Sequence, residues 1–113
     1  MHLVTVSELR QLMQREYNKI VLVDVRTAAE YNAYHIENAI NIPSSLICET
    51  EYGNFAVLNK FKNISSYGFK IILYCKCGNR SMRCVKILRE NGVECLSLHG
   101  GTDKYGTKAE NSV

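Results

Sequence analysis

The sequence alternates short, almost wholly apolar runs with longer amphipathic stretches, and this alternation restricts the fold more than any other feature. Two runs, IVLVDV at 20–25 and IILY at 71–74, have the apolar character of strands covered on both faces. Shorter runs at 3–4, 39–42 and 95–98 complete a set of five expected strands. Strands that alternate with helices are typical of a parallel sheet. The sequence therefore predicts an α/β fold, a five-stranded parallel sheet flanked by helices on both faces.

Capping residues indicate where the helices between these strands begin. Thr5 with Glu8, and Thr27 with Glu30, have the three-residue spacing of a capping box. The first pair predicts a helix with Val6, Leu9, Leu12 and Met13 on its apolar face, and the second a short helix over 28–33. Residues 55–61 and 80–91 also have helical apolar spacing, and Gly92 suits a left-handed C-terminal cap. The segment 44–54 is compatible with either helix or loop.

Length and charge restrict the classes of function. The 113 residues are enough for one domain, predicted over 1–113, in which 103–113 form a loosely packed tail. A net charge of +3, from 14 Lys and Arg against 11 Asp and Glu, is spread along the chain. The chain has no run of basic residues of the kind that binds a nucleic acid, so small anionic substrates match its mild positive charge better than a nucleic acid does. No segment approaches the roughly 20 apolar residues of a membrane span. We expect no membrane association, a cytoplasmic location and five cysteines present as thiols.

The segment from Cys75 to Ser81 carries the most unusual chemistry. Cys75 follows a buried strand, and a helix is expected to begin at Arg80. A loop this short must curl, and Gly78 and Asn79 readily accept the positive φ angles that curling requires. Its backbone N–H groups and the helix N-terminus then form a site for an anion.

A cysteine in such a site is expected to be a nucleophile. Comparable surroundings lower a cysteine pKa from about 8.5 to between about 3.5 and 7.5. Lys76 and Arg80 are expected to add positive charge. The thiolate at Cys75 would attack a sulfane sulfur and pass it to an acceptor. This interpretation requires the thiol to be reachable from solvent and free of surrounding acidic groups.

Two separate stretches resemble the rhodanese-like domain superfamily. One is the six-residue loop CKCGNR at 75–80, and the other is VLVDVRTAAEYNAYHIENAINIP at 21–43, with a terminal GG at 100–101 in support. The resemblance implies a sulfurtransferase in which Cys75 carries a persulfide and needs neither cofactor nor metal. It implies a small anionic donor such as thiosulfate, a thiol or cyanide acceptor, and as a further partner a persulfide-carrying protein. Substrate contacts are expected from the backbone of Lys76, Cys77, Gly78, Asn79, Arg80 and Ser81.

Several residues around this loop have two interpretations. Asp24 and Arg26 either support the loop or form a local turn with an Arg26–Glu30 ion pair, and we favour the local turn. Cys77 either resolves a Cys75 persulfide into a disulfide or points away from the pocket, and we favour the latter. His35 is expected to make a structural hydrogen bond. The superfamily often has a Trp after the terminal GG, and Tyr105 is the nearest aromatic here, which predicts looser C-terminal packing.

Three other functions are compatible with parts of the sequence. Cys77 to Arg83 has the C-x5-R spacing of cysteine-dependent phosphatases and arsenate reductases, although it begins two residues late in the loop. A non-catalytic interaction module is the second alternative, although such domains are marked by loss of the loop cysteine. A zinc site formed by Cys75, Cys77, Cys95 and His99 is the third and least favoured.

Overall fold

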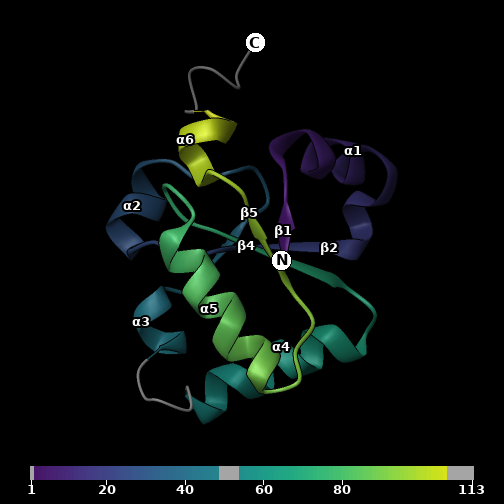
Figure 1. The fold of residues 1–113 in the computed structure, drawn as a ribbon, viewed down its shortest axis with the longest axis vertical. Helices are drawn as coiled ribbons and strands as arrows, with labels where there is room; N and C mark the ends of the chain where they lie inside the picture. The colour runs from purple at the N-terminus through teal and green to yellow at the C-terminus, as the bar shows by residue number, and fades with distance from the viewer. Residues whose placement is uncertain (1, 49–53, 107–113) are drawn as a thin grey trace.

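Five parallel strands form one sheet in the spatial order β1-β5-β4-β2-β3. Figure 1 shows the ribbon with the helices around this sheet. The structure is a computed structural model that describes residues 2–48 and 54–106. The strands are β1 (Leu3–Val4), β2 (Ile20–Asp24), β3 (Ile40–Asn41), β4 (Lys70–Tyr74) and β5 (Leu96–Leu98). The predicted α/β fold with a five-stranded parallel sheet is therefore confirmed.

Helices connect consecutive strands, as parallel pairing requires. They are α1 (Val6–Glu16), α2 (Ala28–Ala33), α3 (Ser44–Ile47), α4 (Phe55–Ser66), α5 (Asn79–Glu90) and α6 (Gly101–Tyr105), with a 3₁₀ turn η1 (Tyr17–Lys19). Both predicted capping boxes form. Helix α4 extends five residues beyond the predicted 55–61, and α5 begins one residue before Arg80. No helix among the described residues has the length and apolar character needed to cross a bilayer.

Side chains of the central strands alternate between two separate cores. On β4, Ile71 and Leu73 pack into the core beneath α3, α4 and α5, together with Cys75 immediately after the strand. Ile72 and Tyr74 point to the opposite face, where Leu9 of α1 is fully buried. This period of two explains why the strands are apolar throughout and places helices on both faces. It also directs the Cys75 side chain toward the face covered by α5.

The first residues of the predicted C-terminal tail belong to α6. Residues 103–105 lie in this helix and Gly106 is buried, whereas Asp103 and Lys104 are exposed. Tyr105 packs against the core that contains Leu9, and the Arg10 guanidinium lies 4.9 Å from its ring centroid. Arg10 also donates to the Tyr105 carbonyl at 3.1 Å. Tyr105 therefore anchors this end of the chain without a tryptophan. The remainder of the predicted tail, 107–113, lies outside the described residues.

Candidate active site

The expected site residues leave the sheet at the same edge because β2 and β4 are neighbours. Asp24 pairs in register with Tyr74, the last residue of β4, and Val25 N–H donates to the Tyr74 carbonyl at 2.9 Å. Cys75 follows β4 directly, and Arg26 lies two residues after the end of β2. In open α/β sheets, ligands bind at this carboxyl edge. Parallel pairing thus brings together segments about 50 positions apart in the sequence.

The Cys75 sulfur lies inside the loop and receives backbone hydrogen bonds. Gly78 N–H and Ser81 N–H point to Sγ at 3.1 and 3.4 Å, and the Ser81 hydroxyl oxygen lies 3.6 Å away. Burial raises the pKa of Cys75, but hydrogen bonds from Ser81, Gly78 and the Arg80 N–H outweigh it, so the pKa lies below its ordinary value. Donors that favour a charged sulfur are the expected feature of a nucleophilic thiolate.

The same loop covers the sulfur. Cys75 is 0 % exposed, which overturns the expectation of a thiol open to solvent. The cover includes the loop itself, because Gly78 is buried above Sγ while Lys76, Cys77 and Asn79 are exposed. Reaction at Sγ therefore requires the loop to move and admit a donor.

Helix α6 holds the loop from its outer side. Thr102 N–H donates to the Cys75 carbonyl at 3.0 Å, and Asp103 N–H donates to the Lys76 carbonyl at 2.9 Å. Because a trans peptide directs its C=O and N–H in opposite directions, these bonds turn the amides of Lys76 and Cys77 away from α6. Gly78 completes the curl with a φ of +109°, which glycine adopts without steric cost.

Ser97 supports the site and was missed by the sequence analysis. Its hydroxyl lies 2.6 Å from that of Ser81, and both side chains are fully buried. Ser81 also donates to the Gly78 carbonyl at 3.1 Å, which ties the start of α5 to the loop. A serine inside the short apolar strand CLSL was the available signal, since a buried hydroxyl needs a partner.

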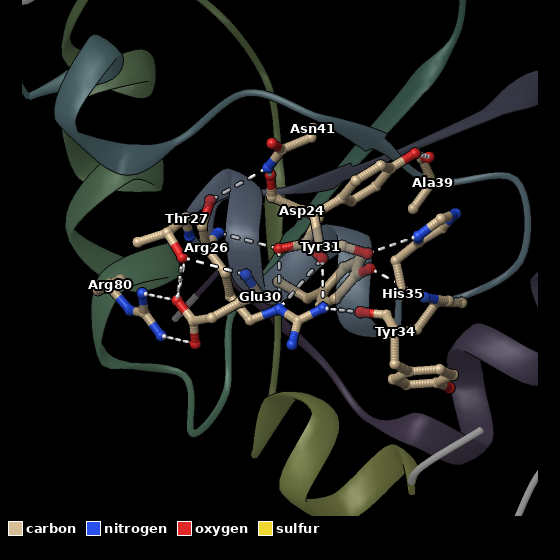
Figure 2. A network of polar contacts seen from close by, with 12 residues as sticks. Asp24, Arg26, Thr27, Glu30, Tyr31, Tyr34, His35, Ala39, Asn41 and Arg80 are labelled. Carbon is tan, nitrogen blue, oxygen red and sulfur yellow. Dashed lines mark hydrogen bonds and ion pairs between the residues drawn. The ribbon is translucent and has the colours of Figure 1, made fainter. Parts of the chain in front are cut away.

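The positive charge expected near the sulfur is largely neutralised. Arg80 forms a two-pronged ion pair with Glu30 of α2, with distances of 2.9 and 3.2 Å (Figure 2). Lys76 pairs with Asp103 at 3.4 Å, and both side chains are more than half exposed. Arg80 therefore connects the loop to α2, and its part in substrate binding stays a prediction. The backbone amides of the loop also contribute positive potential at the sulfur.

Replacing Glu30 by glutamine is expected to destabilise the domain in a pH-dependent way. The side-chain hydrogen bond from Arg80 lowers the pKa of Glu30 from 4.5 to about 2. Because the folded-state pKa is depressed, the stabilisation is fully present above about pH 4.5 and is lost as pH falls through about 2. Both side chains are about one-third exposed, so we expect only about 0.5–1 kcal/mol at pH 7.

Urea denaturation at pH 7 and at pH 3 measures this effect. The difference between wild type and Glu30→Gln should shrink at the lower pH. Glu37→Gln is the matched control, because Glu37 is exposed and has no ion pair among the described residues. A pH-independent difference would contradict the ion-pair interpretation.

Asp24 and Arg26 form a buried local ion pair. The Asp24 carboxylate accepts from the Arg26 backbone N–H, from Nε and from Nη2, the last at 2.7 Å. Nη2 also donates to the Tyr34 carbonyl (Figure 2). The favoured local turn is present, but the expected Arg26–Glu30 pair was wrong because the Arg26 partner is Asp24. Among the described residues neither side chain bonds to the loop that holds Cys75.

Cys77 and His35 lie outside this arrangement. Cys77 is exposed and Sγ has no hydrogen-bond donor within the described part of the chain. That arrangement differs from the enclosed sulfur that a C-x5-R phosphatase loop beginning at Cys77 requires. His35 stacks on Tyr31 at 3.8 Å and its Nδ1 lies 2.9 Å from the Tyr31 carbonyl, which is the expected structural role. Among the described residues no three potential metal ligands gather.

The fold and the site define a class of protein, an α/β domain with a cysteine loop at the carboxyl edge of a parallel sheet. The chain belongs to the rhodanese-like domain family, whose sequence model matches residues 5–108. It is 37 % identical over 93 residues to YqhL of Bacillus subtilis, an uncharacterised protein, covering 81 % of this chain and 65 % of that one. The structure of a rhodanese-like domain protein from Staphylococcus aureus is similar, with a TM-score of 0.77, 29 % identity and coverage of 96 % and 94 %.

Longer proteins match over part of their length. The adenylyltransferase and sulfurtransferase MOCS3-1 of Zea mays is 30 % identical over 100 residues, which cover 81 % of this chain and 20 % of that protein. The chain spans 65, 24 and 49 % of three curated relatives that it matches. The similarity therefore concerns only part of each of these relatives.

Proposed function

We propose that this domain is a sulfurtransferase that carries a sulfane sulfur as a persulfide on Cys75. The observation on which the proposal rests is the Cys75 Sγ, which receives N–H groups from Gly78 and Ser81 inside a loop at a helix N-terminus. Such donors lower the pKa of the thiol and stabilise a negatively charged sulfur. The name of the maize relative, which includes sulfurtransferase, supports the same chemistry.

The proposed reaction is a double displacement. The Cys75 thiolate attacks the outer sulfur of thiosulfate, the S–S bond of thiosulfate breaks, and sulfite leaves with the electron pair. The persulfide that remains has its negative charge on the terminal sulfur, near the loop amides. A thiolate or cyanide then attacks that terminal sulfur, and Cys75 leaves as a thiolate. No electron is gained or lost overall, so neither a cofactor nor an external oxidant is required.

The covered sulfur sets one condition on this mechanism. Because Cys75 is 0 % exposed, the donor reaches Sγ only when the segment from Lys76 to Asn79 moves outward. Outward movement has to release the bond from Asp103 N–H to the Lys76 carbonyl, while the exposed side chains of Cys77 and Asn79 leave that part of the loop uncovered. A persulfide-carrying protein is a second class of sulfur donor for Cys75.

The cellular location that we propose is the cytoplasm. All five cysteines are free thiols, and a reducing compartment keeps thiols in that state.

The mass of the intact protein after incubation with thiosulfate tests the proposal. We expect one sulfur, about 32 Da, on the peptide that contains Cys75, and its complete release as thiocyanate when cyanide is added. Hydrolysis of a chromogenic phosphate ester should be absent. An unchanged mass with thiosulfate and with a small persulfide donor would support a non-catalytic interaction module, and phosphate release would support the phosphatase alternative.

A further inference from the structure

Two cysteine side chains outside the active loop meet where α3 packs against α5 (Figure 1). Cys48 lies at the C-terminal end of α3, and Cys84 lies in the second turn of α5. Their Sγ atoms are 3.8 Å apart, in the contact of a weak thiol hydrogen bond. In the described part of the chain no other two cysteine sulfurs make such a contact. The sulfur transfer proposed above uses neither thiol.

The two thiols differ in their access to solvent. Cys84 is fully buried in the core that also contains Cys75, whereas Cys48 is half-buried and packs against that core. Burial, and next to it the neighbouring Cys48 sulfur, raise the pKa of Cys84 above its ordinary value, so its thiolate is scarce at neutral pH. A small oxidant dissolved in water therefore meets Cys48 first. Cys84 is placed to react with whatever forms at the Cys48 sulfur.

A bond between the two sulfurs requires only a local displacement. A disulfide is about 2.0 Å long, so the sulfurs have to approach each other by about 1.8 Å. Cys84 is fixed by core packing within the twelve-residue helix α5. Cys48 follows a helix of only four residues, to which its backbone N–H is joined by one bond to the Ser44 carbonyl. Rotation of the Cys48 side chain and a shift of this helix end supply the approach.

We propose that Cys48 and Cys84 form a reversible disulfide, which joins α3 to α5 when a low-molecular-weight disulfide accumulates. The Cys48 thiolate attacks one sulfur of the small disulfide, its S–S bond breaks, and one small thiolate leaves. The Cys84 thiolate then attacks the Cys48 sulfur of the mixed disulfide, and the second small thiolate leaves. The two cysteines are oxidised, and the small disulfide is reduced to two thiols, which take up the two protons that the cysteines release.

The position of this pair suits a redox-sensitive link beside the active loop. Cys84 lies one helical turn after Ser81, whose N–H and hydroxyl lie 3.4 and 3.6 Å from the Cys75 sulfur. A reducing compartment keeps the pair as two thiols, and disulfides that form there are usually transient and catalytic or redox-sensing. The inference goes beyond the proposed sulfur transfer and does not depend on it.

Peptide mapping of the protein after incubation with oxidised glutathione tests the proposal. The folded protein is incubated, quenched with acid, labelled with N-ethylmaleimide in denaturant and digested without a reductant. We expect one cross-linked peptide that joins Cys48 to Cys84, with loss of the maleimide label from both residues. The buried Cys95 should stay labelled. Treatment with dithiothreitol before labelling should remove the cross-link and restore both labels.

Three alanine variants assign the role of each thiol. Cys84→Ala removes the second nucleophile, so the reaction should stop at a mixed disulfide between Cys48 and glutathione. Cys48→Ala removes the exposed thiol and should leave Cys84 labelled, because Cys84 is buried. Cys95→Ala is the matched control, since the Cys95 sulfur is buried and its printed contact is the Val85 carbonyl at 4.0 Å. That control should form the same cross-link as the wild type.

The outcomes also separate this inference from the proposed function. Full labelling of Cys84 in the wild type would show that the two sulfurs only pack together, and a cross-link from Cys84 to Cys75 would show that the partner is wrong. Either result overturns the proposal. If Cys84→Ala does not fold, the wild type and Cys48→Ala still decide. A Cys48–Cys84 cross-link in a protein that gains no mass with thiosulfate would leave this inference standing and overturn the sulfur transfer alone.

Discussion

Replacing Cys75 by serine is expected to abolish sulfur loading and to leave the domain folded. The mass of Cys75→Ser should remain unchanged after incubation with thiosulfate, and turnover with cyanide should fall by at least about 10³-fold, as for loss of other catalytic nucleophiles. Serine fits the same volume and accepts the N–H groups of Gly78 and Ser81. The hydroxyl remains protonated at neutral pH, so it is a poor nucleophile where the thiolate is a good one. Circular dichroism and urea denaturation check that folding is retained.

Cys77→Ser is the matched control for this experiment. Cys77 is two residues away and exposed, and no backbone amide among the described residues points to its sulfur. We expect it to load one sulfur like the wild type. Loss of loading in Cys77→Ser, with retention in Cys75→Ser, would move the nucleophile to Cys77 and contradict the proposed mechanism.

Gly101→Ala is expected to destabilise the domain by about 2–5 kcal/mol and to disturb the active loop. A Cβ at this position would lie 2.1 Å from the Cys75 carbonyl oxygen and 2.7 Å from that of Lys76. Both are backbone atoms and cannot move aside as a flexible side chain does. A left-handed φ of +56° adds about 1–2 kcal/mol of strain, and forcing an extra methyl into a packed site adds about 1–3 kcal/mol.

Gly92→Ala separates strain from steric overlap. Gly92 has a similar left-handed φ of +84°, but nothing lies within 4 Å of an added Cβ. It should therefore lose only the strain energy and keep normal sulfur loading. Gly101→Ala should show a larger loss in urea denaturation together with slower loading, because α6 can no longer hold the Cys75 carbonyl. Equal losses of stability and normal loading in both variants would show that the close approach of α6 does not control the loop.

Local patterns were sufficient to predict most of the secondary structure. The capping boxes at Thr5 and Thr27 formed because their hydrogen bonds join residues three positions apart. The two-faced burial of β2 and β4 was predictable because it requires nearly every residue to be apolar. Helix ends were predicted less well. Helix α4 continues to Ser66, beyond the predicted end at residue 61, through a segment that includes polar residues. The exposure of these polar residues depends on the packed fold, so the local pattern did not show that the helix continues.

Around the candidate site, predictions based on charge were the least reliable. Arg26 and Arg80 were both recognised as cations near the loop, but Arg26 was expected to pair with Glu30 and no partner was predicted for Arg80. Glu30 binds Arg80 across 50 positions, and Asp24 binds Arg26 across two. A charged side chain pairs with whichever opposite charge the fold brings near, and spacing in the sequence does not contain that information.

The sequence by itself determined the α/β alternation, the loop from Cys75 to Ser81 and the position of the cysteine after a buried strand, because each depends on residues close together in the chain. Only the tertiary structure decided what surrounds the sulfur. Ser97 from β5 supports Ser81, and α6 holds the Cys75 carbonyl through Thr102. It also decided that Cys75 is covered and that the buried Arg26 is held by Asp24 and by the Tyr34 carbonyl. These features require segments from β2, β4, β5 and α6 to meet, and such contacts arise only when the sheet forms.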